Sequence, residues 1–443
     1  MKVLIVTFSF PPSNTVGAIR VGKLARFLER RGYELRVLTT DVDEDRSLPL
    51  EVPKEWVLYT NYRQRRDWLG LWVGRFRSRP PTGSNGEVSL AQDSKPRKLI
   101  WDLLRRQYHG MVSIPDQRID WMRTAIPAGR RLIEEWKPDI IFASGPPFTG
   151  LIVAGRLSRA FGIPWLADFR DLWARSPYSS FPAWRGLIDL MVERLTLRNA
   201  TALVTISPGM ARQLKEIHHK EVNVVLNGYA EEDFPELPTD DHMTGPLTIR
   251  YLGSLYSGLR DPSPLFAAIG LLESGLRRQI RVEFFGESDA GVQGLAAALG
   301  VADRIFIRPR VPYRTALELQ LRADVLLLLQ WNDSQDEGSI PAKLFEYLYA
   351  RRPILFIGYE HGIAAQLVRD RNAGLVSNHP EQIRDQLQTW IEDKQAGRFK
   401  RLDPSVSRGL SRDEQYQKLE RLFGEILQSG PPQTLGLYRG EKR

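Results

Sequence analysis

The chain has 443 residues, of which 42% are hydrophobic and 26% charged, and its formal net charge is +9. This length allows two or three domains with cores of their own, and the composition excludes collagen-like and low-complexity proteins. The absence of cysteine excludes disulfides, thiolate nucleophiles and cysteine zinc sites, and the six histidines show no metal-binding spacing. We therefore expect a globular protein of a reducing cytoplasm that binds no metal.

The chain begins with a short apolar run, MKVLIVTFSFPP, which lacks a small-residue cleavage site and ends at Pro11-Pro12. This run predicts a buried first strand, and no apolar window reaches the roughly 18 uninterrupted residues of a membrane-spanning helix. Short apolar runs then alternate with amphipathic stretches. The expected strands are Lys2–Phe8, Leu35–Thr40, Asp139–Ala143, Pro164–Asp168, Ala202–Ile206 and Val222–Leu226, and the expected helices include Gly17–Arg31, Pro147–Phe161, Trp184–Arg198 and Pro208–Glu216. Continuously apolar strands, each followed by a helix, predict a doubly wound parallel sheet.

A basic segment interrupts this first half as an insertion at about residues 55–125. Between Asn61 and Gly110, eleven Lys and Arg face four acidic residues, a net charge of +7, and tryptophans are interleaved with them. This mixture favours docking to an anionic membrane surface. The protein would then be a peripheral protein at the inner face of the membrane. A solvated insertion and a nucleic-acid patch are the alternatives, and no recognised nucleic-acid module accompanies the charge.

A polar linker at Leu237–Pro246 precedes a second run of strands and helices. The expected strands are Leu247–Gly253, Ile280–Gly286, Arg304–Ile307, Val325–Gln330 and Pro353–Gly358, and the expected helices lie near Pro262–Glu273, Ala290–Leu299, Tyr313–Arg322, Pro341–Ala350 and Glu381–Asp393. The fold class is therefore α/β, with two Rossmann-like domains at residues 1–236 and 247–404. A last helix, Asp413–Leu427 within residues 405–430, is expected to pack across the first domain.

Ligands of open parallel sheets bind beyond the carboxyl ends of the strands, so two such domains that face one another would form a deep cleft. Six segments lie at such ends and are expected to line it: Ser9–Gly17, Ser144–Pro147, Asp168–Asp171, Gly253–Arg260, Gly286–Ser288 and Gln330–Ser339.

The stretch DEGSIPAKLFEYLYARRPIL begins a helix near Pro341. The N-terminus of this helix and the charge of Lys343 suit a phosphate or diphosphate. Glu346 shares a face with Lys343 but lies one turn deeper, where its carboxylate could accept hydrogen bonds from a sugar diol. The alternative is that the two residues form an ordinary solvated pair.

Five motifs in order resemble the retaining glycosyltransferases of the B-type fold, the group 1 or family 4 class, particularly those of bacterial surface-polysaccharide synthesis. These motifs are FSFPPSNTVGAIRVGKLARFLERRGYELRVLTT, SGPPFTGLIVAGRLSRAFGIPWLADFRDLW, TISPGMARQL followed by VVLNGYAEEDF, YLGSLYSGLRDP and GSIPAKLFEYLYARRPIL. The resemblance implies transfer of a sugar from a nucleotide-diphosphate donor with retained anomeric configuration and without a metal or another cofactor. The diphosphate leaves, so cationic groups must stabilise its growing charge.

The resemblance assigns donor-binding roles in the second domain. The backbone of Gly338, Ser339 and Ile340 would hold the phosphates together with Lys343, and Glu346 would bind the ribose hydroxyls.

The motif departs from the family at two places. Gly338 stands where the family usually has a first glutamate, for which neighbouring Glu337 could substitute, and Gly253 is followed by Ser254 rather than arginine. Arg260 is then the expected remaining phosphate ligand, unless it is an ordinary turn arginine.

In the first domain, Gly17 would allow close approach of the backbone to a diphosphate or sugar, or is an ordinary loop-to-helix glycine. Asp168 and Asp171 lie where many relatives have a histidine that faces the transferred sugar. Either carboxylate could bind a sugar hydroxyl or accept the acceptor's proton, and the alternative is an internal ion pair with Arg170.

The leading function is therefore a transferase that acts on a lipid-linked or polysaccharide acceptor at the inner face of the membrane. A nucleotide-sugar 2-epimerase of the same architecture and a non-catalytic carbohydrate or nucleic-acid binder are the alternatives.

Overall fold

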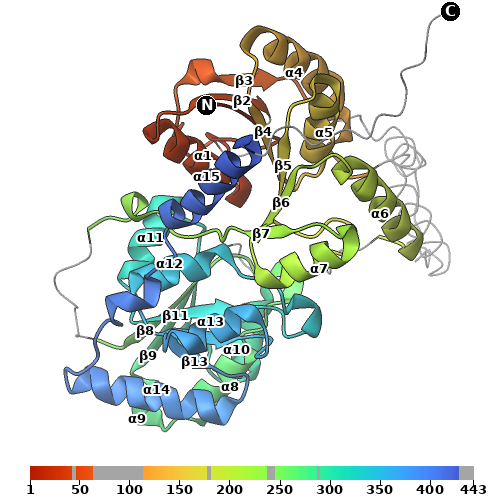
Figure 1. Ribbon diagram of the computed structural model, residues 1–443. Coiled ribbons are helices and arrows are strands. Elements are labelled where there is room, and N and C mark those ends of the chain that lie inside the picture. The colour runs from red at the N-terminus through yellow and green to blue at the C-terminus, as the bar shows by residue number, and fades with distance from the viewer. Residues whose placement is uncertain (42–45, 63–112, 177–180, 237–244, 287–289, 429–443) are drawn as a thin grey trace, which may run out of the picture. The chain divides into compact units, whose positions relative to one another are not determined.

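The computed structural model describes residues 1–41, 46–62, 113–176, 181–236, 245–286 and 290–428. The chain divides into two compact units, one of residues 1–204 with 422–443 and the other of residues 205–421. Two sheets with intervening helices confirm the predicted α/β class (Figure 1). Within the described residues, no helix combines the length and apolarity that crossing a bilayer requires.

One sheet has seven strands in the order β3-β2-β1-β4-β5-β6-β7. Its strands are β1 (Lys2–Thr7), β2 (Glu34–Thr40), β3 (Val57–Thr60), β4 (Ile140–Gly145), β5 (Trp165–Phe169), β6 (Ala202–Thr205) and β7 (Val222–Val224). Strand β1 pairs in parallel with β2 and β4, which places Val3 beside both Leu35 and Ile140. Apolar residues fill β1 because the strand is buried on both faces.

Five helices accompany these strands: α1 (Val16–Arg30), α4 (Met122–Trp136), α5 (Thr149–Phe161), α6 (Ala183–Leu197) and α7 (Pro208–His218). Helix α1 begins at Thr15, whose hydroxyl accepts a hydrogen bond from the backbone N–H of Ala18 at 3.1 Å. Helix α5 ends at Gly162, whose φ of 68° lies in the left-handed region that favours glycine.

The second sheet lies in residues 205–421 and has six strands in the order β10-β9-β8-β11-β12-β13. Its strands, all paired in parallel, are β8 (Leu247–Leu252), β9 (Ile280–Phe285), β10 (Ile305–Arg308), β11 (Val325–Leu329), β12 (Ile354–Ile357) and β13 (Gly374–Val376). The helices are α8 (Ser263–Leu271), α9 (Ser274–Arg277), α10 (Ala290–Ala298), α11 (Tyr313–Leu321), α12 (Ala342–Ala350), α13 (Ile363–Asp370), α14 (Pro380–Gln395) and α15 (Arg412–Gln428).

Strand β11 shows why this sheet needs helices on both faces. Its sequence VLLLL is entirely buried, and alternate side chains enter two different hydrophobic clusters. Val325, Leu327 and Leu329 pack with residues of α8, α10 and α14, whereas Leu326 and Leu328 pack with residues of α11, α12 and α13. The continuous apolar run therefore encodes a doubly covered strand.

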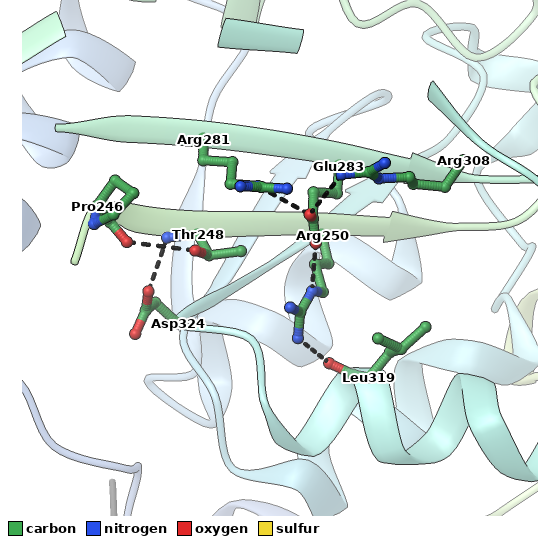
Figure 2. Close-up of polar contacts among 8 residues, drawn as sticks. All are labelled: Pro246, Thr248, Arg250, Arg281, Glu283, Arg308, Leu319 and Asp324. Carbon is green, nitrogen blue, oxygen red and sulfur yellow. Dashed lines mark hydrogen bonds and ion pairs between the residues drawn. The ribbon is translucent and has the colours of Figure 1, made fainter. Parts of the chain in front are cut away.

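Towards the β10 edge, charged side chains replace apolar ones on the face that carries α11. Figure 2 shows Arg250, Arg281 and Arg308 gathered around the buried carboxylate of Glu283. Arg250 and Arg281 donate to it at 2.9 and 2.8 Å, and Arg308 lies at 3.8 Å. Arg250 also donates to the carbonyl of Leu319 at 2.9 Å, so this ion-pair cluster anchors α11 to the sheet.

The predicted strands and helices are all present, and their ends lie within two residues of the prediction. Among the α-helices and strands of the described residues, five were not predicted: β3, α4, α9, α13 and β13. The predicted insertion at 55–125 was too wide, because residues 57–60 form an edge strand beside β2 and residues from 122 onwards form α4. Residues 63–112, which hold most of the basic segment, lie outside the described residues, as does most of the expected linker.

The units also differ from the predicted domains, because the first boundary falls at residue 204 rather than near 236. Residues 225–229 belong with the second unit through backbone contacts to the segment before α15. The backbone N–H of Tyr229 donates to Leu410, and that of Arg412 donates to Tyr229. The second boundary falls inside α15, whose end belongs to the first unit, where Phe423 lies 6.2 Å from Phe142 between ring centres.

Candidate active site

Helix α12 begins at Pro341, as the sequence predicts, and no side chain caps its N-terminus. Just before it, Ile340 is buried, and the backbone N–H of Ser339 donates to the carbonyl of Asp336 at 3.1 Å. Gln330, at the end of β11, donates to the carbonyl of Ser339 at 3.2 Å. These contacts hold the loop in place, so the positive end of the helix dipole is available to an anion.

Lys343 lies in the first turn of α12 and reaches the carboxyl end of β8. Its ammonium donates to the carbonyl of Leu252 at 2.7 Å and lies 4.4 Å from the ring centre of Tyr251. Burial and, to a smaller extent, the nearby charge of Arg260 lower the pKa of Lys343 from 10.5 to about 7, against the opposing effect of Glu346. A bound anion would reverse this effect, because it would stabilise the charged ammonium.

Gly253 follows β8 and is required there for two reasons. Its φ is 147°, in the region that side chains rarely adopt, and a Cβ at this position would collide with the ammonium of Lys343. The absence of a side chain at Gly253 therefore leaves room for the ammonium of Lys343.

Arg260, the expected phosphate ligand, lies close enough to Lys343 for the two charges to interact. Its guanidinium lies 4.2 Å from the ring centre of Tyr256, and it donates to the carbonyl of Ser254 at 3.1 Å. The hydroxyl of Tyr251 donates to the same carbonyl at 2.7 Å. Two cationic side chains thus converge at the end of β8, which is a suitable arrangement for a diphosphate.

Glu346 is 9% exposed and does not form a solvated pair with Lys343. The Tyr313 hydroxyl and the Gln320 amide, both on α11, donate to its two carboxylate oxygens at 3.0 Å each. Burial raises the pKa of Glu346, while Gln320, Arg412, Tyr313 and Lys343 lower it. Each carboxylate oxygen has a second lone pair, so the group can still accept hydrogen bonds from a diol.

Tyr313, Gln320 and Arg412 are functional candidates that sequence reasoning missed. Arg412 is 6% exposed, and its Nη1 has no hydrogen-bond partner among the described residues. No local pattern marks these residues, since they lie 33, 26 and 66 positions away from Glu346 in the chain.

Gly338 packs against the start of α7. A Cβ at Gly209 would lie 2.6 Å from the Cα of Gly338, so the two backbones touch. Ser207 caps α7 by accepting from Met210, and its hydroxyl donates to the carbonyl of Gly338. One serine therefore joins the first turn of α7 to the loop that precedes α12.

Glu337, the proposed substitute for the missing family glutamate, has a 53% exposed side chain. Its carboxylate lies 3.6 Å from the guanidinium of Arg212 on α7. A Cβ at neighbouring Gly338 would meet nothing closer than 3.4 Å, so the backbone at this position leaves room for a Cβ. Whether Glu337 contacts the transferred sugar stays a prediction.

The candidates of the first unit gather at the carboxyl ends of β4 and β5. Asp168 has no exposed surface, and both of its oxygens are engaged: Arg20 donates to them at 3.1 and 2.8 Å, and Ser144 donates at 2.7 Å. The ion pair considered for Asp168 therefore exists, with hydrogen bonds from Arg20, and the charge of Arg170 interacts with both Asp168 and Asp171. Asp171, in contrast, is exposed.

Arg170 occupies the space at Gly17. A Cβ at Gly17 would collide with the Arg170 guanidinium, which also donates to the carbonyl of Pro146. The Nε of Arg170 has no hydrogen-bond partner in the described part of the chain. Gly17 thus permits close approach of a cationic side chain to the start of α1. Among the described residues, no group of three or more His, Asp or Glu is arranged to hold a metal ion.

Comparison with known proteins finds a family that is similar to part of the chain. Residues 17–230, a little under half of the chain, match the family described as Glycosyl transferase 4-like domain. No curated protein is significantly similar in sequence.

Solved structures show the same fold over nearly the whole chain. Sucrose-phosphate synthase from Thermosynechococcus elongatus has a TM-score of 0.63 at 14% identity, with 97% of this chain and 100% of that chain covered. HepE from Anabaena in complex with UDP has a TM-score of 0.61 at 13% identity, with 96% and 100% covered. A UDP-N-acetylglucosamine 2-epimerase has a TM-score of 0.51 at 15% identity, with 99% of each chain covered. At these identities the likeness establishes the fold alone, which transferases and an epimerase share.

Proposed function

We propose that the protein transfers a sugar from a nucleotide-diphosphate donor, with retained configuration, to a lipid-linked or polysaccharide acceptor of cell-surface glycan synthesis. Two findings support this proposal: residues 17–230 match the family described as Glycosyl transferase 4-like domain, and the chain shares the fold of sucrose-phosphate synthase and HepE. The observation that carries the proposal is the convergence of Lys343 and Arg260 at the end of β8, beside the uncapped N-terminus of α12. HepE, which has the same fold, was crystallised with UDP.

In this proposal the two cationic residues stabilise the diphosphate as it leaves. Negative charge grows on the diphosphate oxygens while the sugar bond breaks, and preorganised cations lower the energy of that transition state. The backbone N–H groups of the α12 N-terminus contribute in the same direction. Glu346, held by Tyr313 and Gln320, binds the ribose hydroxyls one turn deeper, so the nucleotide is oriented at both ends.

The two aspartates of the first unit take different roles. Asp171 is exposed and is the carboxylate that binds a sugar hydroxyl or accepts the acceptor's proton. Asp168 has no exposed surface and positions Arg20 and Ser144 around it. The guanidinium of Arg170 lies against Gly17, so a cation and the N-terminus of α1 are both near these aspartates.

We further propose that the reaction needs no metal and takes place at the inner face of the cell membrane. Two protein cations and a helix N-terminus supply the charge that a divalent ion otherwise supplies to a diphosphate. The basic segment 61–110 would attract the protein to anionic lipid.

Incubation with radiolabelled nucleotide sugars, with and without a bacterial membrane lipid extract, tests the function. If the protein is a transferase, the radiolabel should move from the nucleotide sugar to the lipid extract, and removal of metal ions with a chelator should leave the rate of transfer unchanged. An epimerase, which the shared fold makes the second candidate, converts the donor without extract. Binding without either reaction would refute both enzymatic functions.

A further inference from the structure

Helix α6 buries charged side chains and exposes apolar ones, which is the reverse of the usual arrangement for a helix at a water-exposed protein surface. Arg185, Asp189 and Glu193 are buried, at 1%, 7% and 1% exposure. Leu187, Met191 and Leu195, spaced by four residues, are 73%, 56% and 56% exposed. A helix that covers a protein core normally shows the reverse arrangement.

The buried charges hold the helix in this orientation. Arg185 donates to Asp189 at 2.7 Å and to the backbone carbonyls of Ser113 and Pro115 at 2.7 and 2.8 Å. Glu193 accepts from the backbone N–H of Ala174 at 2.9 Å. A rotation of the helix that buried Leu187, Met191 and Leu195 would remove the partners of these charged groups. The free-energy cost of that loss is larger than the gain from burying the three apolar side chains.

The outward face carries positive charge only. Arg194 and Arg198 are exposed and, at seven and eleven residues after Leu187, lie on the same side of the helix. Both acidic residues of α6, Asp189 and Glu193, are on the buried side. The outer surface of α6 is therefore an apolar stripe that ends in two arginines.

We propose that this outward face of α6 (Leu187, Met191, Leu195, Arg194 and Arg198) binds the surface of an anionic lipid bilayer. The apolar side chains enter the boundary between headgroups and acyl chains, and the arginines contact lipid phosphates. Since the proposed acceptor is lipid-linked, this surface would hold the enzyme beside its substrate, and to that extent the assignment rests on the proposed function.

Charge disfavours two other occupants of the stripe. A second copy of the chain in a two-fold dimer would bring the same arginines to the interface with no exposed acid of α6 to pair with them. The chain's own segment 61–110 has a net charge of +7, the same sign as the outer face of α6. An anionic partner with an apolar interior fits both properties of the surface.

The test is sedimentation of the full chain with vesicles of phosphatidylcholine alone or mixed with phosphatidylglycerol. The triple variant Leu187→Gln, Met191→Gln, Leu195→Gln changes no charge and should bind mixed vesicles at least about tenfold more weakly. The double variant Arg194→Gln, Arg198→Gln should bind mixed vesicles more weakly than wild type and phosphatidylcholine vesicles as wild type does, and added salt should abolish the difference between the two proteins. Leu271→Gln, on α8 and 49% exposed, is the matched control and should bind as wild type does.

Unchanged binding of the triple variant to mixed vesicles would overturn the assignment. A lower melting temperature of that variant would show that another part of the chain covers the stripe, and conversion of an oligomer to a monomer would show that a second copy does; either result also overturns it. Nucleotide-sugar binding, measured without vesicles, should be unaffected, so a failed donor assay and a failed docking assay are separate results.

Discussion

Lys343 makes donor binding dependent on pH in a direction that the structure determines. Its pKa in the free protein is about 7 because it is buried and lies near Arg260. A diphosphate binds the charged ammonium, so binding below pH 7 meets a lysine that is already protonated, whereas binding above pH 7 requires proton uptake. Affinity for the donor should therefore fall as the pH rises through 7.

The magnitude follows from the titration of one group. With a pKa of about 7, the ammonium is about nine-tenths charged at pH 6 and about one-tenth charged at pH 8. The apparent dissociation constant should rise about tenfold over this range, equivalent to about 1.4 kcal/mol. The increase levels off only above the higher pKa that Lys343 has in the complex.

The assay is isothermal titration calorimetry with whichever of UDP-, GDP- and ADP-glucose binds most tightly at pH 6. At pH 7, buffers of different ionisation enthalpy should reveal uptake of about half a proton per donor bound. Lys343→Arg is the control, because a guanidinium stays charged throughout and should bind with little pH dependence. A wild-type affinity that does not change between pH 6 and 8, or a tenfold change that persists in Lys343→Arg, would refute this role of Lys343.

Three further predictions concern single side chains. Glu346→Gln should reduce turnover at least about tenfold with a nearly unchanged melting temperature, because the amide keeps a hydrogen-bonding group beside Tyr313 and Gln320, and an equal loss of stability would make Glu346 a structural residue instead. Gly253→Ala should cost about 1–3 kcal/mol of unfolding free energy and abolish donor binding, because its φ is 147° and its Cβ meets Lys343; wild-type affinity in calorimetry would contradict this. Glu283→Ala should lower the unfolding free energy in urea by about 3–5 kcal/mol, because it leaves Arg250 partly buried without its carboxylate, and a loss below about 1 kcal/mol would show that water replaces the ion pair.

The elements and contacts that the sequence did not predict were missed for physical reasons. Strand β13 has three residues, Gly374 to Val376, and is too short to show a periodicity. Strand β3 and helix α4 flank a segment whose charge dominated the sequence pattern. The partners of Glu346 and Asp168 were missed or misassigned because the contacts join residues far apart in the chain, such as Arg20 and Asp168, 148 positions apart.

What the sequence determined by itself is the order and type of most elements. Continuous apolar runs such as VLLLL specify strands buried on both faces, Pro341 marks the start of α12, and the spacing of Lys343 and Glu346 places them on one face of that helix. These are local properties, because hydrogen bonding and steric limits act over a few residues.

The tertiary structure decided which groups surround each candidate side chain. Burial lowers the pKa of Lys343, two side chains of α11 donate hydrogen bonds to Glu346, and Arg20 donates to Asp168. The orientation of α6 belongs to the same class, because the partners of Arg185 at residues 113 and 115 lie about 70 positions earlier in the chain. Desolvation and ion pairing depend on packing between distant segments, which local sequence pattern does not contain.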